Sequence, residues 1–265
     1  MAEETASGQA CGCMEALQTA GRIIIENGGE TYRAEETICR MGQGMGLTEV
    51  ESFAVPSGLF ISYRRPDGQL ETSVKRIHRK GTNLIRIDRV NDISRKVSAG
   101  GMSTGNALAE LRGIELRPGP YTSGWLLAGA FVCAAGFALL FGGGFPEVLA
   151  AGLVAGIVQA AGMLSSRFHV QWIFSSIVGG FLTSLLPHLI CRYLPAISLE
   201  TVIAGALMPL VPGLAMTNAV QDTMRGDMVS GLSHGAQAVL TACLVAGGAL
   251  VANALMRILE GGILP

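Results

Sequence analysis

The chain has 265 residues, a formal net charge of −1 and a pI near 6.4, and 49% of its residues are hydrophobic while only 15% are charged. With 36 glycines and a mean hydropathy of +0.44, this composition excludes an ordinary soluble globular protein and indicates a membrane protein. The near-neutral charge also excludes a nucleic-acid-binding protein that relies on a basic surface.

Residues 1–118 carry most of the charge and are predicted to form a small α+β domain. Apolar residues at helical spacing predict two helices, or one kinked helix, on either side of the Asn27-Gly28-Gly29 break. Alternating apolar residues then predict a short antiparallel meander over residues 53–63 and 70–77. Two further helices, over residues 82–97 and 103–114, would cover this small sheet.

Residues 119–265 are predicted to form a transmembrane helical domain. A spanning helix needs about 20 predominantly apolar residues, and five apolar runs approach or exceed that length. We therefore expect an α-helical integral membrane bundle of about five transmembrane helices, preceded by the small α+β cytoplasmic domain. The five runs cover residues 125–141, 148–164, 172–190, 197–216 and 228–255.

The basic residues between the runs predict the orientation of the chain. Arginine and lysine near the ends of spanning helices favour the cytoplasmic side. Arg112 and Arg117 precede the first run, and the polar, acidic start of the chain carries no secretory signal. The N-terminus is therefore expected in the cytoplasm and, after five spans, the C-terminus outside.

Two prolines interrupt the fourth run. Pro209 and Pro212 each remove a backbone donor, which frees carbonyl groups and breaks the helix before Gly213. Broken helices within a membrane line protein or a water-filled cavity, and many transporters bind substrate there. The alternative is a cytoplasmic loop in which Asp227 only caps the last helix.

A polar segment follows the break. Asn218 and Asp222 are four residues apart, as are Gln221 and Arg225, so helical geometry would place them on a stripe. Nine glycines are expected to let helices approach closely. They are Gly152, Gly156, Gly179, Gly180, Gly205, Gly231, Gly235, Gly247 and Gly248.

Motifs for other classes of function are weak. The spacing of the histidines and cysteines predicts no metal site, and the glycines of residues 42–46 do not fit a nucleotide-binding loop, so no cofactor is expected. If the soluble domain were a membrane-tethered enzyme, its candidate acids would be Glu30, Glu35, Glu36 and Asp88.

Several segments, taken in order, resemble the threonine/serine exporter family in its two-polypeptide form. The resemblance implies a multi-pass inner-membrane exporter of small amino or organic acids, including dicarboxylates such as succinate. It also implies a second transmembrane subunit of the same family as partner. The matching segments are residues 28–38, beginning Gly28-Gly29-Glu30-Thr31-Tyr32-Arg33, then Thr82-Asn83-Leu84, residues 89–95, and residues 209–227 with Ser230-Gly231.

One departure from the family pattern falls in the last segment. After Ser230-Gly231 the pattern carries an arginine and, three residues on, a glutamate, whereas this chain has His234 and Gln237. If these positions handle substrate charge or a proton, specificity or coupling would differ here. Packing against a neighbouring helix is the alternative for both residues.

The resulting hypothesis is export by alternating access across the lipid bilayer. Asn218 and Asp222 would recognise an ammonium group or couple a proton, and Arg225 would pair with a carboxylate. An odd, small number of spans favours a partner subunit or a homo-oligomer, and a regulatory or scaffold subunit is the alternative. The candidate substrate-binding or coupling residues are Pro209, Pro212, Gly213, Thr217, Asn218, Gln221, Asp222, Arg225, Asp227, His234 and Gln237.

Overall fold

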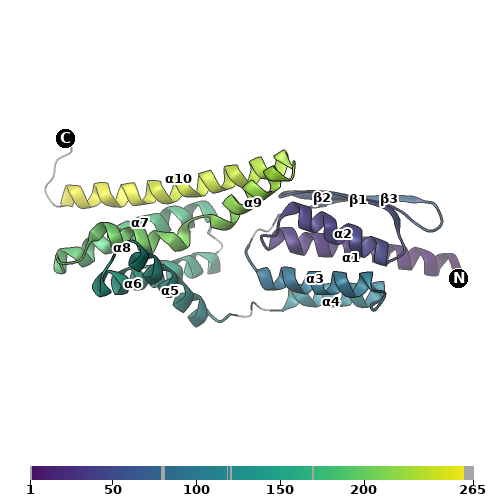
Figure 1. The fold of residues 1–265 in the computed structure, drawn as a ribbon, viewed down its shortest axis with the longest axis horizontal. Coiled ribbons are helices and arrows are strands. Elements are labelled where there is room, and N and C mark those ends of the chain that lie inside the picture. The colour runs from purple at the N-terminus through teal and green to yellow at the C-terminus, as the bar shows by residue number, and fades with distance from the viewer. Residues whose placement is uncertain (1, 79–80, 118, 120, 169, 260–265) are drawn as a thin grey trace. The chain divides into compact units, whose positions relative to one another are not determined.

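The computed structural model describes residues 2–78, 81–117, 119, 121–168 and 170–259, with side chains from residue 12 onward. The chain divides into two compact units (Figure 1). The N-terminal unit contains Met1–Gly119 and Leu214–Ala236, and the bundle unit contains Pro120–Gly213 and Gln237–Pro265. The sequence division at 118/119 assigns residues 214–236 to the helical part, whereas their contacts group them with the N-terminal unit.

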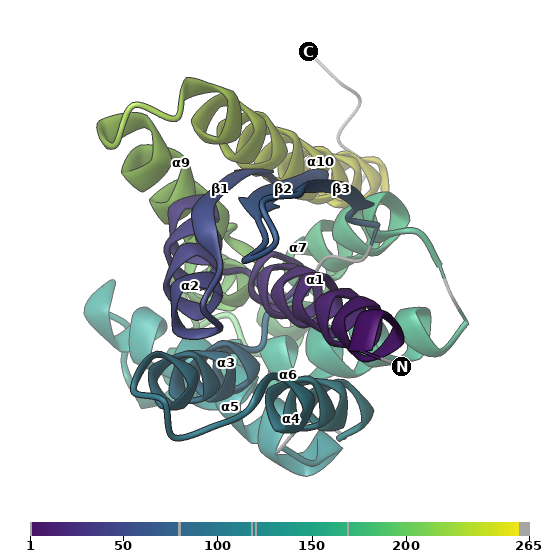
Figure 2. The same ribbon diagram turned by 90° about the vertical axis from the view of Figure 1, so that its right-hand side faces the viewer.

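The N-terminal unit contains the predicted meander and helices. Its strands pair antiparallel in the order β1-β2-β3, and two layers of helices lie on one side of the sheet (Figure 2). The core joins Leu17, Ile38, Leu59, Val90 and Leu111, each from a different element. The elements are α1 (Ala2–Glu26), α2 (Thr31–Gly44), β1 (Thr48–Val55), β2 (Gly58–Arg64), β3 (Leu70–Arg76), α3 (Leu84–Ser98) and α4 (Thr104–Leu116).

The sequence allowed either two helices or one kinked helix before the sheet. The structure has two helices, α1 and α2, separated by a turn. Gly28 has a φ of +89°, a left-handed conformation that favours glycine. Its N–H donates to the Ile25 carbonyl at 3.3 Å, and the Gly29 N–H donates to the Ile24 carbonyl at 2.9 Å. This Schellman arrangement ends α1 and lets α2 begin at Thr31.

The apolar runs form helices long enough to cross a membrane. Among the described residues, four helices have the length and hydropathy of a membrane span. A fifth span exists only if α8 (Leu199–Leu207) with the 3₁₀ turn Met208–Leu210 and α9 (Gly213–Met224) count as one bent span. The predicted break at Pro212 is therefore confirmed. The four helices are α5 (Ser123–Leu140), α6 (Phe145–Arg167), α7 (Trp172–Tyr193) and α10 (Met228–Leu259).

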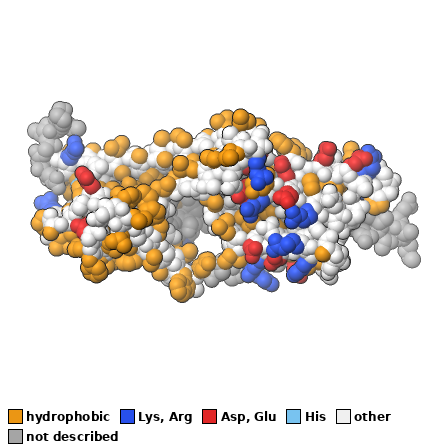
Figure 3. All heavy atoms as spheres, in the orientation of Figure 1, with side chains coloured by type: hydrophobic (Ala, Val, Ile, Leu, Met, Phe, Trp, Pro, Cys, Tyr) orange, Lys and Arg blue, Asp and Glu red, His pale blue; other side chains and the backbone are white. Residues whose placement is uncertain are grey.

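The bundle unit exposes apolar side chains. Trp125, Val132 and Leu139 on α5 each keep more than 60% of their surface exposed, and hydrophobic side chains cover the bundle on the face drawn in Figure 3. The same view shows lysine, arginine, aspartate and glutamate gathered mainly over the N-terminal unit. A helix pairs its own backbone N–H and C=O groups, so helices with apolar surfaces can face lipid without leaving polar groups unpaired.

Some of the predicted glycines allow close helix packing, and others do not. A Cβ added at Gly180 of α7 would overlap the Val245 carbonyl oxygen on α10, and one at Gly248 would overlap the Ile177 carbonyl oxygen. By contrast, a Cβ at Gly247 would meet nothing within 4 Å. Ser184 also donates to Asn253 Oδ1 at 2.9 Å across the same pair of helices.

We predict that Gly248→Ala destabilises the protein by about 1–3 kcal/mol, because the added methyl group overpacks α7 against α10. The neighbouring Gly247→Ala is the matched control and should be neutral or slightly stabilising, since alanine favours helix. Thermal unfolding of the purified protein in detergent measures both. Equal melting temperatures for the two variants would contradict the close approach at Gly248.

Candidate functional site

The turn between α9 and α10 is built by local hydrogen bonds within the N-terminal unit. Gly226, with a φ of +89°, turns the chain, and the Asp227 N–H donates to the Asp222 carbonyl at 2.9 Å. Asp227 Oδ1 then accepts the Ser230 N–H at 3.0 Å, so Asp227 caps α10, the role that the alternative interpretation of the sequence gave it. Glycine at position 231 leaves room for the Thr223 hydroxyl, which a Cβ there would overlap.

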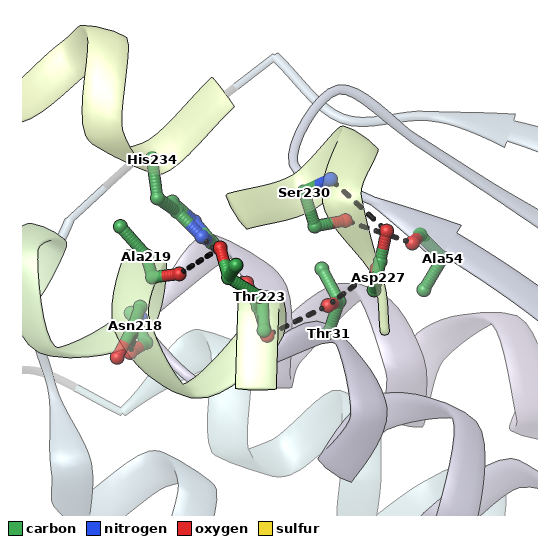
Figure 4. Close-up of polar contacts among 10 residues, drawn as sticks. Thr31, Ala54, Asn218, Ala219, Thr223, Asp227, Ser230 and His234 are labelled. Atoms are coloured by element: carbon green, nitrogen blue, oxygen red, sulfur yellow. Dashed lines mark hydrogen bonds and ion pairs between the residues drawn. The ribbon is translucent and has the colours of Figure 1, made fainter. Parts of the chain in front are cut away.

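One hydroxyl lies between two carboxylates. Thr31 Oγ1 is 3.1 Å from Asp222 Oδ1 and 3.2 Å from Asp227 Oδ2 (Figure 4). Its single proton can be donated fully to only one of them at a time. Thr31 and Asp222 are both fully buried. Because Thr31 is the first residue of α2, both carboxylates lie near the positive end of that helix, which favours negative charge.

His234 contacts the other oxygen of Asp222. Its Nδ1 is 2.9 Å from Asp222 Oδ2, and 13% of the imidazole side chain is exposed. A neutral imidazole with the proton on Nδ1 donates a hydrogen bond here, and a protonated one forms an ion pair. Both oxygens of the buried Asp222 carboxylate therefore have partners, one from α2 and one from α10.

Two further hydrogen bonds attach α9 and α10 to the rest of the N-terminal unit, and a third joins α2 to β1 beside them. Asn218 Nδ2 donates to the Gly28 carbonyl at 3.1 Å. The Ser230 hydroxyl donates to the Ala54 carbonyl at 3.4 Å, and Glu35 Oε1 accepts the Ala54 N–H at 2.7 Å. Ala54 lies on the edge strand β1, so these side chains satisfy backbone groups that a neighbouring strand would otherwise pair.

Glu35 is a third carboxylate of this cluster. Burial raises its pKa, the Ala54 N–H lowers it, and the charges of Asp227 and Asp222 raise it further, with a net upward shift. We call Thr31, Glu35, Asp222, Asp227 and His234 the acid cluster. In the sequence, Thr31 stands out only as part of a family-like segment without a site role, and Glu35 only as a candidate enzyme acid. No local sequence pattern relates Thr31 and Glu35 to the other members of the cluster, which lie nearly 200 positions further along the chain.

The remaining predicted residues lie outside the acid cluster. The Arg225 guanidinium carbon is 3.5 Å from the centre of the Tyr32 ring, and the side chain is exposed. Gln221 Oε1 is buried without a hydrogen-bond partner among the described residues. Thr217 lies on the exposed face of α9. Pro209, Pro212, Gly213 and Gln237 belong to the bundle unit.

Metal coordination finds no support here. In the part of the chain that the structure describes, no group of three or more histidine, cysteine, aspartate or glutamate side chains is arranged to hold a metal ion. The acid cluster itself offers hydroxyl, imidazole and carboxylate groups already paired with each other. Such an arrangement can exchange protons and break or form ion pairs.

A family model described as "Putative threonine/serine exporter" matches residues 15–256. The chain belongs to this family. The family is one of transporters rather than enzymes, and with four or five candidate spans its member here is a multi-pass membrane protein. No solved structure matches the chain.

Two kinds of relatives are similar to this chain. It is 24% identical to the "Probable threonine/serine exporter" of Mycobacterium tuberculosis, over 85% of this chain and 43% of that protein. It is 22% identical to the "Threonine/serine exporter" of Corynebacterium glutamicum, over 92% of this chain and 51% of that protein. It is 26% identical to the "Probable succinate transporter subunit YjjP" of Escherichia coli, over 88% of this chain and 90% of that protein. The chain thus spans about half or less of the two exporters.

We predict that Thr31→Val destabilises the protein by about 1–3 kcal/mol, because two carboxylates lose their shared donor while the shape of the side chain is kept. Thr31→Ser retains the hydroxyl and should recover most of the loss. The melting temperature of the full chain in detergent reports both. A valine variant as stable as the wild type would show that the hydroxyl contributes nothing to the acid cluster.

We predict a pH-dependent effect of Glu35→Gln. With a raised pKa, folded Glu35 keeps its proton to higher pH than the unfolded chain, so the free energy of unfolding falls as pH rises from the ordinary value of 4.5 through the raised pKa. Glutamine cannot lose a proton and still accepts the Ala54 N–H. The variant should therefore match the wild type near pH 4.5 and melt at a higher temperature at pH 8.

The neighbouring Glu36→Gln is the control, because Glu36 is exposed and pairs with Arg40 on the surface. Its melting temperature should follow that of the wild type across the same pH range. A difference between Glu35→Gln and wild type that does not change with pH would contradict the raised pKa.

Proposed function

We propose that this chain is one subunit of an inner-membrane exporter of small amino or organic acids, such as threonine and serine or a dicarboxylate. It works by alternating access with a second transmembrane subunit, with its N-terminus in the cytoplasm and its C-terminus outside. Family membership and the candidate spans support a transporter. The relative named as a transporter subunit, which this chain spans almost fully, supports a partner.

The observation that carries the proposal is the fully buried Asp222 between Thr31 and His234. Burying an ionisable group away from water is costly, and buried acids with a specific partner are often functional. Both Asp222 oxygens already have partners, so an incoming ammonium group would have to displace one. A proton needs no such space. We therefore assign Asp222 and His234 to proton coupling rather than to direct substrate binding.

The charge balance of the acid cluster explains how a proton would drive movement. Glu35, Asp222 and Asp227 are three acids, and His234 is the basic side chain hydrogen-bonded to them among the described residues. A proton on Asp222 would weaken its pair with His234, and a proton on any of the three acids would reduce the repulsion between them. Either change alters how firmly α9 and α10 are held to α2. This contact, made or loosened, would be the two-state element that alternating access requires.

Arg225 fits a role at the substrate entrance. Its exposed guanidinium is stacked on Tyr32, which keeps the positive charge accessible to a carboxylate while its position is restricted. The carbonyl groups freed by Pro209 and Pro212 would contribute to the pathway in the bundle unit. Asn218, bonded to Gly28, would hold α9 rather than contact substrate.

The test is efflux of preloaded labelled threonine, serine and succinate from cells expressing the chain with and without its partner subunit. Asp222→Asn should reduce partner-dependent efflux to background, because asparagine cannot ionise or exchange a proton. Asp92→Asn is the control, since Asp92 is an exposed acid on α3 paired with Arg95. It should leave efflux unchanged.

Two outcomes would contradict the assignment. Full efflux by Asp222→Asn would place coupling outside the acid cluster. The second outcome is unchanged efflux by Asp222→Asn together with loss of efflux when the residues before Trp125 are deleted. The chain would then be a regulatory or scaffold subunit whose partner forms the pathway.

A further inference from the structure

All four of the segments that carry the family resemblance contribute residues to a pocket that the acid cluster does not use. The pocket has a volume of about 290 Å³ and lies within the N-terminal unit. It is formed by the α1–α2 turn, the first turns of α2 and α3, and one residue of α9. The lining residues are Gly28, Gly29, Glu30, Arg33, Leu84, Ile87, Asp88, Asn91 and Leu214.

Backbone hydrogen bonds hold the walls of this pocket in place. The Gly81 N–H donates to the Glu26 carbonyl at 2.8 Å, and the Asn83 N–H donates to the Asn27 carbonyl at 3.0 Å. These bonds attach the start of α3 to the turn after α1. A Cβ at Gly29 would lie 3.2 Å from Ile87 Cδ1, so glycine permits this close approach. The pocket is thus a partly open hollow whose walls are joined by backbone hydrogen bonds.

The polar lining combines one cation with two acids. Arg33 Nε lies 3.1 Å from Glu30 Oε2, and Asp88 and Asn91 face the same space one helical turn apart on α3. Leu84, Ile87 and Leu214 supply an apolar wall. A guanidinium pairs with a carboxylate, and acids pair with an ammonium group. Among the described lining residues, a dicarboxylate would meet two acids and one cation.

We propose that this pocket is a binding site for a free α-amino acid with a small side chain, separate from the acid cluster. The ligand carboxylate binds Arg33, its ammonium group binds Glu30 and Asp88, and its side chain lies against Leu84 and Ile87. The volume suits a ligand of this size. Binding does not depend on the export proposed above, and the site would let the N-terminal unit sense the amino acid.

Occupancy of the pocket would reach the acid cluster through α9. Leu214 lines the pocket, and Asn218, one turn later on the same helix, donates to Gly28 on the pocket wall. A ligand that favours one position of α9 changes the stability of the arrangement around Asp222. By linkage, a proton bound at the acid cluster and a ligand bound in the pocket then change each other's affinity by the same factor.

The experiment measures binding of labelled L-serine and L-threonine to the full chain purified in detergent, with succinate as competitor. Arg33→Gln and Asp88→Asn should each weaken binding roughly 10- to 100-fold, the loss expected for one charge-assisted hydrogen bond. Arg40→Gln is the matched control for Arg33, because both lie on α2, pair with a preceding glutamate and expose 46–47% of the side chain. Asp92→Asn is the control for Asp88 on α3.

The site is supported if Arg33→Gln and Asp88→Asn lose affinity for serine and threonine while both control variants bind like the wild type. Succinate should compete only weakly. No amino-acid binding by the wild type, or binding insensitive to both pocket variants, overturns it. Succinate that binds more tightly than serine also overturns it. Binding abolished by Asp222→Asn but not by Arg33→Gln would move the ligand to the acid cluster. Efflux measured in parallel separates failure of this site from failure of the exporter.

Discussion

The burial of the Asp222 carboxylate is the constraint on which the arrangement of the N-terminal unit depends. An ionised group without access to water must be paired and hydrogen-bonded, or it destabilises the fold. Asp222 obtains its partners from Thr31 at the start of α2 and His234 on α10. Satisfying this one group therefore requires α9, α10 and α2 to lie together, which explains why residues 214–236 pack with the N-terminal unit.

The turn between α1 and α2 connects the two candidate sites. Its Gly28 carbonyl accepts the Asn218 amide next to the acid cluster, while Gly28 and Gly29 also form a wall of the amino-acid pocket. The left-handed Gly28 leaves that carbonyl free, because the Schellman bonds use the N–H groups. A single glycine turn thus relates the acid cluster to the pocket proposed to bind an amino acid, within a family of transporters.

The bundle unit depends on a different physical principle. Lipid offers its helices no hydrophobic driving force for association, so close backbone approach at small residues and polar contacts hold them together. Gly180 and Gly248 permit that approach between α7 and α10, and Ser184 with Asn253 adds a hydrogen bond. Gly247 and Gly156 have no neighbour within 4 Å of an added Cβ, so a small residue alone does not mark a packing surface.

The sequence by itself determined the features that depend on neighbouring residues. Periodicity predicted the meander, the apolar helices and the shared face of Asn218 and Asp222, and proline chemistry predicted the break at Pro212. Only the tertiary structure decided that Thr31 and His234 share Asp222, that Glu35 joins them and that Arg225 stacks outside. The Thr31–Asp222 contact joins residues 191 positions apart. Such a pairing arises from packing and leaves no periodic signal in the sequence.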